Sequence, residues 1–303
     1  MRWRIYLSLV REAGRHWVAD RAPGMGAALA FYSAFSIAPL LIIVSGVAGA
    51  VLGEKAAHGA IVEQLTGIVG EHAAEAIQAL LVGAQSRASG VIASTVGVVT
   101  LLIGATTVLV ELQAALDQIW DAPPRPGHGL RTLLQSRATS LVLILGIGFV
   151  FLVSFGLTGA MAVFGKHWGA IFPGIASALL VLNILFSMGV VTVMIAMLYK
   201  WLPNVPVKWR DVWVGAATTA VLFTLGQTAI GFYVAQSAMA SMHGAAGAML
   251  VLLTWLYYSA QIFLFGAEFT RAYANRNALI GADCLAAGAV PAEAASADEA
   301  RAG

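Results

Sequence analysis

The stretch LLVLNILFSMGVVTVMIAM (179–197) decides the fold class of this 303-residue chain. It is apolar almost throughout and shows no alternation of apolar and polar residues. A barrel strand that faces lipid on one side and a lumen on the other would alternate with a period of two. Because backbone groups in lipid must be hydrogen-bonded within their own segment, this stretch predicts a membrane-spanning helix.

The composition extends this prediction to the whole chain. Hydrophobic residues make up 59% of the sequence and charged residues 11%, with a mean hydropathy of +0.83. A soluble domain carries about a quarter charged residues, so a soluble globular enzyme is excluded. Six apolar segments each reach the ~20 residues that a helix needs to cross ~30 Å of hydrocarbon. They are residues 27–53, 91–116, 138–164, 174–199, 212–236 and 245–270, which predicts an all-α polytopic protein with six transmembrane helices.

The basic residues predict the orientation of these spans. Only Lys55, Arg87 and Lys166 fall on one side of the membrane, and all other Lys and Arg residues fall on the opposite side. The positive-inside rule therefore places both termini in the cytoplasm. The first apolar run begins after 26 residues, exceeds the length of a signal core and is followed by five more spans, so we expect it to remain as the first helix.

The segments outside the spans have patterns of their own. Residues 1–26 predict a basic amphipathic helix at the anionic cytoplasmic surface, for which a simple anchoring role is the alternative. Its apolar face carries Trp3, Tyr6, Leu7, Val10 and Trp17, and Arg4, Arg11 and Arg15 lie on another face. Residues 54–90 predict two short outer amphipathic helices, and residues 276–303 a disordered cytoplasmic tail that contains the single Cys284.

Two carboxylates are the only charged side chains inside the predicted spans, Glu111 and Glu268. Both are expected near the cytoplasmic ends of their helices. A carboxylate inside a membrane usually faces a water-filled cavity or a partner, and it can bind a proton or a cation. The alternative is that each snorkels to the nearby interface, with Glu268 paired to Arg271 three residues further on.

The sixth span adds polar residues at helical spacing. Thr254, Tyr258, Gln261, Phe265 and Glu268 follow a four-three-four-three pattern, which predicts one polar stripe facing the interior of the bundle. Asn183 and Gln227 are further buried polar candidates, although such residues more often join helices than bind ligands. These residues, with Glu111, form the predicted polar path.

Two other features bear on function. Pro39 lies midway through the first span, where it leaves a backbone carbonyl without its usual partner and predicts a hinge. Lys208, Trp209, Arg210 and Trp213 form a basic and aromatic cluster at the start of the fifth span. This cluster is typical of an interfacial anchor, and a site for anionic lipid headgroups or a partner is the alternative.

Several stretches resemble the YihY/BrkB family of bacterial inner-membrane proteins, formerly called ribonuclease BN. They are ALAFYSAFSIAPLLII (28–43), ELQAALDQIW (111–120), LPNVPVKWRDVWVGA (202–216), FTLGQTAIGFYV (223–234) and GAAGAMLVLLTWLYYSAQIFLFGAEFTRAYA (244–274). The resemblance covers residues 1–275, with His243 standing where relatives often have Tyr. It implies a six-helix inner-membrane protein with cytoplasmic termini, for which virulence and transport roles have been suggested.

The residues do not support the ribonuclease name. The six His residues are scattered on both sides of the membrane and show no spacing typical of a metal site. The largest cytoplasmic loop is shorter than a nucleic-acid-binding module. We therefore expect no enzyme activity, no cofactor and no nucleic-acid partner. A membrane enzyme that acts on lipid is a weaker option, because the chain shows no recognisable nucleophile with its base.

The leading hypothesis is transport of a small solute or lipid through a polar path between helices. No ATP-binding P-loop is present, so uphill transport would need an ion gradient or a partner. The alternative is a non-transporting scaffold in envelope biogenesis or virulence, with a dry and well-packed bundle. The expected partners are the lipid bilayer, anionic lipid headgroups, and further copies of the chain or envelope proteins.

Overall fold

The computed structural model describes residues 2–36, 91–123, 173–236 and 245–299, together with the isolated positions 78, 146, 149, 150 and 153. The helices are α1 (Arg2–Ala19), α5 (Val91–Ile119), α7 (Pro173–Trp201), α8 (Trp209–Gln236) and α9 (Ala245–Glu299), and residues 22–36 form a further helical stretch. All regular elements in these ranges are helices, which confirms the predicted all-α class.

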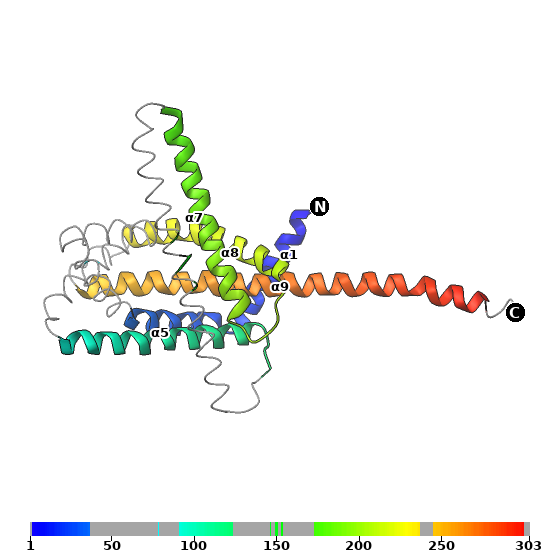
Figure 1. Cartoon of the computed structure of the whole chain (residues 1–303), viewed down its shortest axis with the longest axis horizontal. Helices are drawn as coiled ribbons and strands as arrows, with labels where there is room; N and C mark the ends of the chain where they lie inside the picture. The colour runs from blue at the N-terminus through cyan, green and yellow to red at the C-terminus, as the bar shows by residue number, and fades with distance from the viewer. Residues whose placement is uncertain are drawn as a thin grey trace.

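Helix α9 is the central element of the described bundle. It contacts α1, α5 and α8, and α8 in turn contacts α7. Figure 1 shows α5, α8 and α9 running alongside one another, with α7 crossing them steeply. Beyond its contacts α9 continues as a helix to Glu299 and projects away from the bundle (Figure 1).

The composition of residues 276–303, rich in Ala with Asp and Glu, predicts a disordered tail. In the structure α9 continues as a helix through Glu299. Ala is also the strongest helix former, so the same composition favours continuation of a helix that has already begun.

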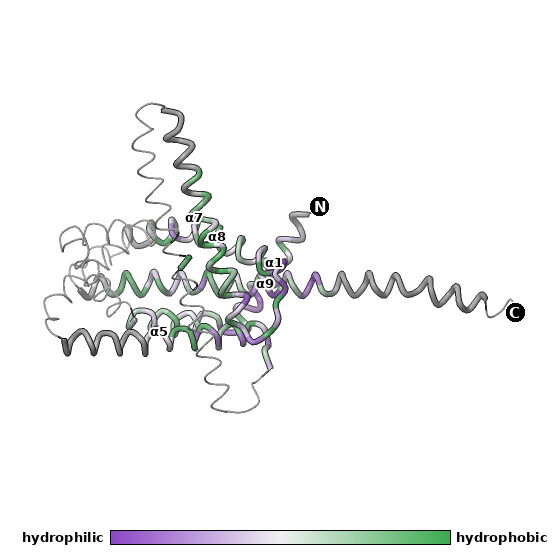
Figure 2. The backbone as a smooth tube through the Cα atoms, in the orientation of Figure 1, coloured by the Kyte–Doolittle hydropathy of each residue, from purple (hydrophilic) through white to green (hydrophobic). Residues whose placement is uncertain are grey.

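Two stretches of the described helices are long and apolar enough to cross a membrane, Trp209–Ile230 in α8 and Met249–Ala278 in α9. A shorter apolar stretch covers Leu185–Trp201 in α7. Hydrophobic residues colour much of α7, α8 and α9 in Figure 2. The predicted span 138–164, the outer segment 54–90 and residues 37–53 lie outside the described residues apart from the isolated positions.

Two backbone turns bring acidic residues to one end of the bundle. Arg21 has a positive φ of 55° and ends α1 next to Asp20, and its carbonyl accepts the amides of Gly24 and Met25 as the next helix starts. Asp121 has a positive φ of 47° and ends α5, where the Ala122 amide bonds back to the Asp117 carbonyl. This is the bonding pattern of a helix C-cap in the left-handed conformation.

Arg271 joins the ends of α1 and α5 here, Asn277 of α9 contacts Asp211 at the start of α8, and Lys200 lies against Trp209. Because Arg21, Lys208 and Arg210 are neighbours of these residues in the chain, we call this part of the bundle the basic end. Contacts between elements connect its parts. The Asn204 amide donates to Asp117 Oδ1 over 2.7 Å, joining the loop after α7 to α5. Asn277 Nδ2 donates to Asp211 Oδ1 over 2.8 Å, joining α9 to the first turn of α8.

Small residues let α7, α8 and α9 approach closely. A Cβ atom added at Gly215 would overlap Thr270 Oγ1, and one added at Gly266 would overlap Thr219 Oγ1. The buried Tyr199 hydroxyl donates to the Phe263 carbonyl over 2.6 Å and lies 3.2 Å from Thr219 Oγ1. In lipid, close packing of this kind and hydrogen bonds between helices hold a bundle together.

Helix α1 has two apolar faces with different surroundings. Leu9 and Ala13 are buried against Phe269 and Ala272 of α9, and Trp17 packs on the main core. Tyr6, Leu7 and Val10 are exposed. The predicted apolar face is therefore only partly packed. The face that contacts α9 is the neighbouring one, where the small Ala13 side chain allows close approach.

Candidate functional site

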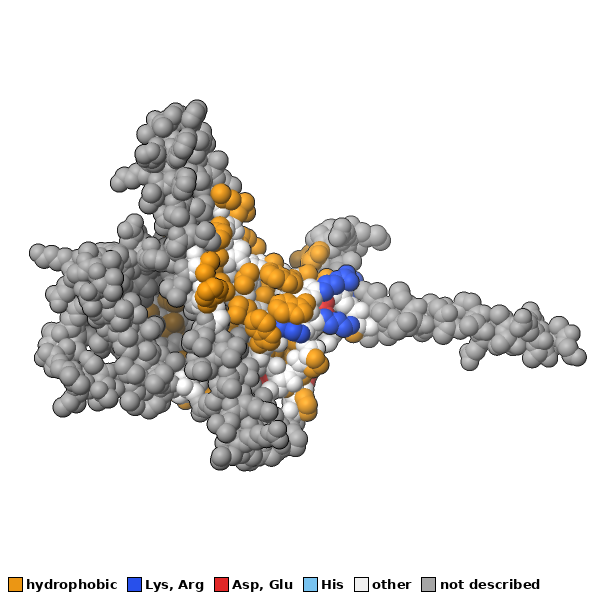
Figure 3. All heavy atoms as spheres, in the orientation of Figure 1, with side chains coloured by type: hydrophobic (Ala, Val, Ile, Leu, Met, Phe, Trp, Pro, Cys, Tyr) orange, Lys and Arg blue, Asp and Glu red, His pale blue; other side chains and the backbone are white. Residues whose placement is uncertain are grey.

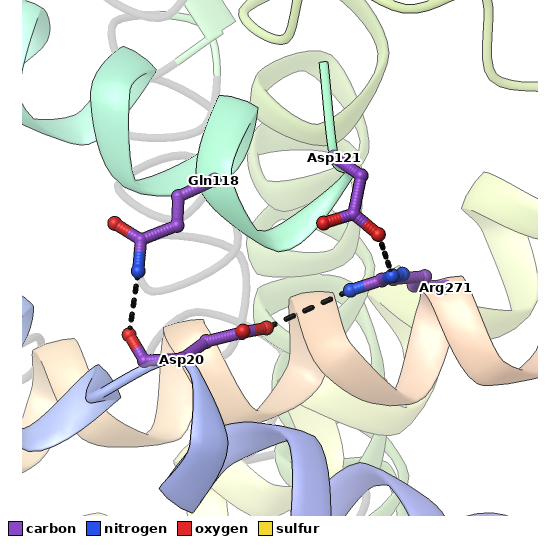
Figure 4. Close-up of polar contacts among 4 residues, drawn as sticks. All are labelled: Asp20, Gln118, Asp121 and Arg271. Carbon is purple, nitrogen blue, oxygen red and sulfur yellow. Dashed lines mark hydrogen bonds and ion pairs between the residues drawn. The ribbon is translucent and has the colours of Figure 1, made fainter. Parts of the chain in front are cut away.

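Three charged residues from three separate elements meet at the basic end. Arg271 of α9 lies between Asp20, which follows α1, and Asp121, which follows α5 (Figure 4). Its Nη1 atom lies 3.6 Å from Asp20 Oδ2, and its Nη2 atom donates to Asp121 Oδ2. We call Asp20, Asp121 and Arg271 the Arg271 clasp, since one guanidinium holds two chain turns against α9.

A backbone contact supports the clasp. Gln118 in the last turn of α5 donates from Nε2 to the Asp20 carbonyl oxygen over 2.8 Å (Figure 4). Asp20 is thus tied to α5 through its backbone and to α9 through its side chain. The Arg271 side chain is 15% exposed, so water screens its interaction with Asp20 less than that of a surface pair.

Glu268 lies one turn before Arg271 and is buried in the same region. It is 1% exposed, and its charged neighbours are Asp20, Arg271 and Asp121. Among the described residues, no N–H donor reaches Oε1 or Oε2 of Glu268, and the polar group beside it is the Asp20 carboxyl, which only accepts hydrogen bonds when ionised. The alternative of a Glu268–Arg271 pair is not what the described contacts show, because Arg271 pairs with Asp20 and Asp121.

Gln261 lies two turns before Glu268 on the same face of α9. Its side chain is 9% exposed, and its Nε2 atom donates to the Pro23 carbonyl over 3.4 Å. Its Oε1 atom is buried and meets no donor among the described residues. Gln261 and Glu268 therefore place three unbonded acceptor atoms along the buried face of one apolar helix.

The remaining stripe residues divide between faces of α9. Tyr258 is 40% exposed, whereas Gln261 and Glu268 are buried, and its place in the predicted path stays a prediction. Since a helix turns about 100° per residue, Tyr258 is rotated by about 60° from Gln261 and lies at the edge of the stripe. Thr254 is half-buried.

The remaining predicted path residues lie on other helices. Glu111 on α5 and Gln227 on α8 are both half-buried. The side chain of Asn183 and the whole of Pro39 lie outside the described residues, so the predicted hinge remains a prediction. Near it, Ser36 donates to the Tyr32 carbonyl over 3.1 Å and packs where Gly104 of α5 leaves room.

The predicted basic and aromatic cluster lies on the surface. Lys208, Trp209, Arg210 and Trp213 are all exposed. Lys200 Nζ lies 5.6 Å from the Trp209 ring centre, which is within cation–π range. Figure 3 shows hydrophobic side chains beside Lys and Arg on the face in view. This arrangement fits an interfacial anchor.

The clasp is the part of the site that the sequence did not predict. Asp20 and Asp121 lie outside the predicted spans, where charged residues are ordinary, and no local spacing links them to Arg271. Their shared signal is that each is an acidic residue beside a predicted helix end on the basic side. Within the described part of the chain, no three His, Cys, Asp or Glu side chains are grouped as metal ligands would be.

Comparison with known proteins identifies the family of this chain. The model of the family described as virulence factor BrkB matches residues 13–286. A UPF0761 membrane protein of Pseudomonas paraeruginosa is 31% identical over 268 residues, which are 86% of this chain and 61% of that protein. A UPF0761 membrane protein of Ralstonia nicotianae is 26% identical over 273 residues, 86% of this chain and 57% of the relative.

The chain thus spans about three fifths of the length of these relatives. No solved structure matches it. The matches confirm the resemblance and the expectation of a membrane protein. The family model covers nearly all of the described bundle, including α5, α7, α8 and the clasp residues. The chain is a member of the BrkB family of membrane proteins.

Proposed function

We propose that the protein moves a small solute or a lipid across or within the bacterial inner membrane, without enzymatic chemistry. The path runs along the buried polar face of α9, where Gln261 and Glu268 lie. Thr254 and Glu111 extend the path away from these two residues. Both termini face the cytoplasm, so the basic end of the bundle is its cytoplasmic end.

The observation that carries this proposal is the environment of Glu268. Burying a carboxylate in a membrane helix costs free energy unless a hydrogen-bond donor or a cation binds it. Glu268 is 1% exposed, and neither of its oxygen atoms meets a donor among the described residues. A water chain, a cation or a solute with N–H or O–H groups would supply the missing partner.

The charged groups around Glu268 indicate which kind of solute the path would favour. Three carboxyl groups, those of Asp20, Asp121 and Glu268, surround the single guanidinium of Arg271. When all four groups are ionised, this cluster carries a net negative charge. It would attract cations or donor-bearing groups and repel anions.

The Arg271 clasp acts as the cytoplasmic gate in this proposal. It joins the turn after α1, the end of α5 and α9 on the cytoplasmic side of Glu268. Breaking either ion pair would release one turn from α9 and open a way to Glu268. An ion-pair gate is suitable for a transporter because its closed and open states differ only by the formation of a few ion pairs.

A scaffold is the second candidate, favoured by the close packing of α7, α8 and α9. Gly215 and Gly266 leave no room even for a methyl group, and the Tyr199 hydroxyl is fully hydrogen-bonded within this core. A dry bundle of this kind is what a non-transporting role in envelope biogenesis requires. The two roles differ in whether water reaches Gln261 and Glu268.

A cysteine scan along α9 tests the proposal. Thr254, Tyr258, Gln261 and Glu268 are replaced one at a time by Cys in a Cys284→Ser background, which removes the single natural thiol. A membrane-impermeant thiol reagent is then applied from each side of the membrane. Labelling at positions 261 and 268, with none at the outward-facing position 258, is the expected result. Protection at both 261 and 268 would contradict the path and favour the scaffold.

A further inference from the structure

Helix α1 presents an exposed apolar stripe that no described residue covers. Leu7, Val10 and Val18 are exposed, and a Cβ atom added at Gly14 would meet no atom within 4 Å. Since a helix turns about 100° per residue, these four positions lie within about 80° of one another. They form one continuous stripe that begins beside the face packed on α9, at Val10, and turns away from that face toward Val18.

Basic side chains border this stripe. Arg11 and Arg15 are exposed and lie next to Val18 on the helix circumference, and Arg21 follows at the turn. The exposed Glu12 lies further round, toward the face packed on α9. An apolar stripe bordered by arginines is the pattern of a helix that lies in the headgroup region of a membrane.

The packing of α1 holds the stripe at the depth of the headgroups. Leu9 and Ala13 are buried against Phe269 and Ala272 of α9. Phe269 lies at the end of the predicted span 245–270 and Ala272 two residues beyond it, where we expect hydrocarbon to give way to headgroups. The stripe lies on the part of α1 that this packing leaves exposed.

We propose that the stripe of Leu7, Val10, Gly14 and Val18 docks on anionic lipid of the leaflet at the basic end, with Arg11 and Arg15 recognising the phosphates. Charge complementarity selects lipid as the occupant, since each arginine near an anionic surface contributes about 1 kcal/mol of attraction. This inference does not depend on transport. It requires only that the protein lies in a membrane, which its family establishes.

The test uses the full chain in nanodiscs that each hold one copy. Val10→Cys in the Cys284→Ser background carries an environment-sensitive fluorophore, and Glu12→Cys is the matched control on the same helix. The discs contain either phosphatidylcholine alone or phosphatidylcholine with phosphatidylglycerol. Iodide in the buffer reports how far each fluorophore is exposed to water.

The expected result is that iodide quenches the label at Val10 weakly in anionic discs and strongly in zwitterionic discs, and quenches the label at Glu12 in both. Replacing both arginines, Arg11→Gln with Arg15→Gln, is expected to lower the docking equilibrium on the order of thirtyfold and to restore quenching at Val10. High salt should act in the same direction, since it screens exposed charges.

Three outcomes would overturn the proposal. Strong quenching at Val10 in both kinds of disc would mean that α1 does not dock on lipid. Weak quenching in both would mean that uncharged lipid or protein covers the stripe. Protection that persists in the double arginine variant would exclude recognition by charge. Because the two arginines are exposed, the variant is expected to unfold at the same temperature as its parent.

Discussion

At the scale of single residues, Glu268 and Arg271 are neighbours on α9 with opposite surroundings. Glu268 is buried without a donor, whereas Arg271 is shared between two carboxylates from other elements. A single turn of helix thus separates a carboxyl group without a donor from a guanidinium that is paired twice. This contrast leads to different expectations for the two substitutions that remove these charges.

Replacing Glu268 by Gln should leave the fold intact. Gln has the same size and removes a buried charge that no described donor balances and that lies near Asp20. Glu268→Gln is therefore expected to be at least as stable as the parent in thermal unfolding in detergent, while it loses transport. A loss of more than about 2 kcal/mol would show that the carboxylate holds the bundle together.

Replacing Arg271 should have the opposite effect on stability. Arg271→Gln leaves Asp20 and Asp121 without the guanidinium that pairs with both, so we expect a loss of about 2–4 kcal/mol in the free energy of unfolding. Asp121→Asn is the matched variant, because the Asp121 side chain is 72% exposed and its pair should contribute less than about 1 kcal/mol. Denaturation of the purified variants measures both values, and equal losses would contradict the assigned geometry.

At the scale of elements, the close contacts among α7, α8 and α9 depend on glycine residues. Gly215 faces Thr270, and Gly266 faces Thr219 and Tyr199. These contacts keep α9 at a fixed distance from α7 and α8, and so fix the face on which Gln261 and Glu268 lie. Packing therefore determines the site as much as the polar residues do.

Adding one methyl group tests this packing. Gly215→Ala and Gly266→Ala are each expected to destabilise the protein by about 1–3 kcal/mol, because the new Cβ would overlap a buried Thr side chain. Gly189→Ala on α7 is the control, since its Cβ would meet nothing within 4 Å and should stabilise the helix by up to about 1 kcal/mol. Thermal unfolding of the three variants distinguishes overlap from a general effect of the substitution.

The sequence predicted the helices better than it predicted their partners. The apolar segments of the sequence predicted α5, α7 and α8 within a few residues of their ends. A segment that crosses lipid must be apolar and must form its backbone hydrogen bonds within a helix, so composition indicates where such a helix begins and ends. It also selected Gln261 and Glu268 as buried, since helical spacing defines a face. Spacing does not say which element covers that face.

The parts that could not be predicted depend on contacts between distant segments. Asp20, Asp121 and Arg271 meet only because two turns with a positive φ end their helices at the same place. A four-three spacing places residues near one face but still moves each of them around the helix axis, so Tyr258 lies about 60° from Gln261 and is more exposed. Tertiary packing decides both cases.

At the scale of the whole molecule, the proposed orientation depends on the unequal distribution of Lys and Arg. We expect a green fluorescent protein fused at either terminus to be fluorescent, and alkaline phosphatase inserted within residues 54–90 to be active. Inactive phosphatase at that insertion, with both terminal fusions non-fluorescent, would reverse the topology. The clasp would then face the periplasm.

One comparison tests most directly whether the Arg271 clasp closes a water-filled path leading to Gln261. The reporter is Gln261→Cys in the Cys284→Ser background, with the clasp intact or opened by Arg271→Gln, and Leu264→Cys is the control because Leu264 is fully buried in the core. The rate of labelling by an impermeant thiol reagent is measured from the cytoplasmic side. The account predicts faster labelling at position 261 when the clasp is opened and none at 264. Equal rates at 261 with and without Arg271, or no reaction at 261 in either protein, would contradict it.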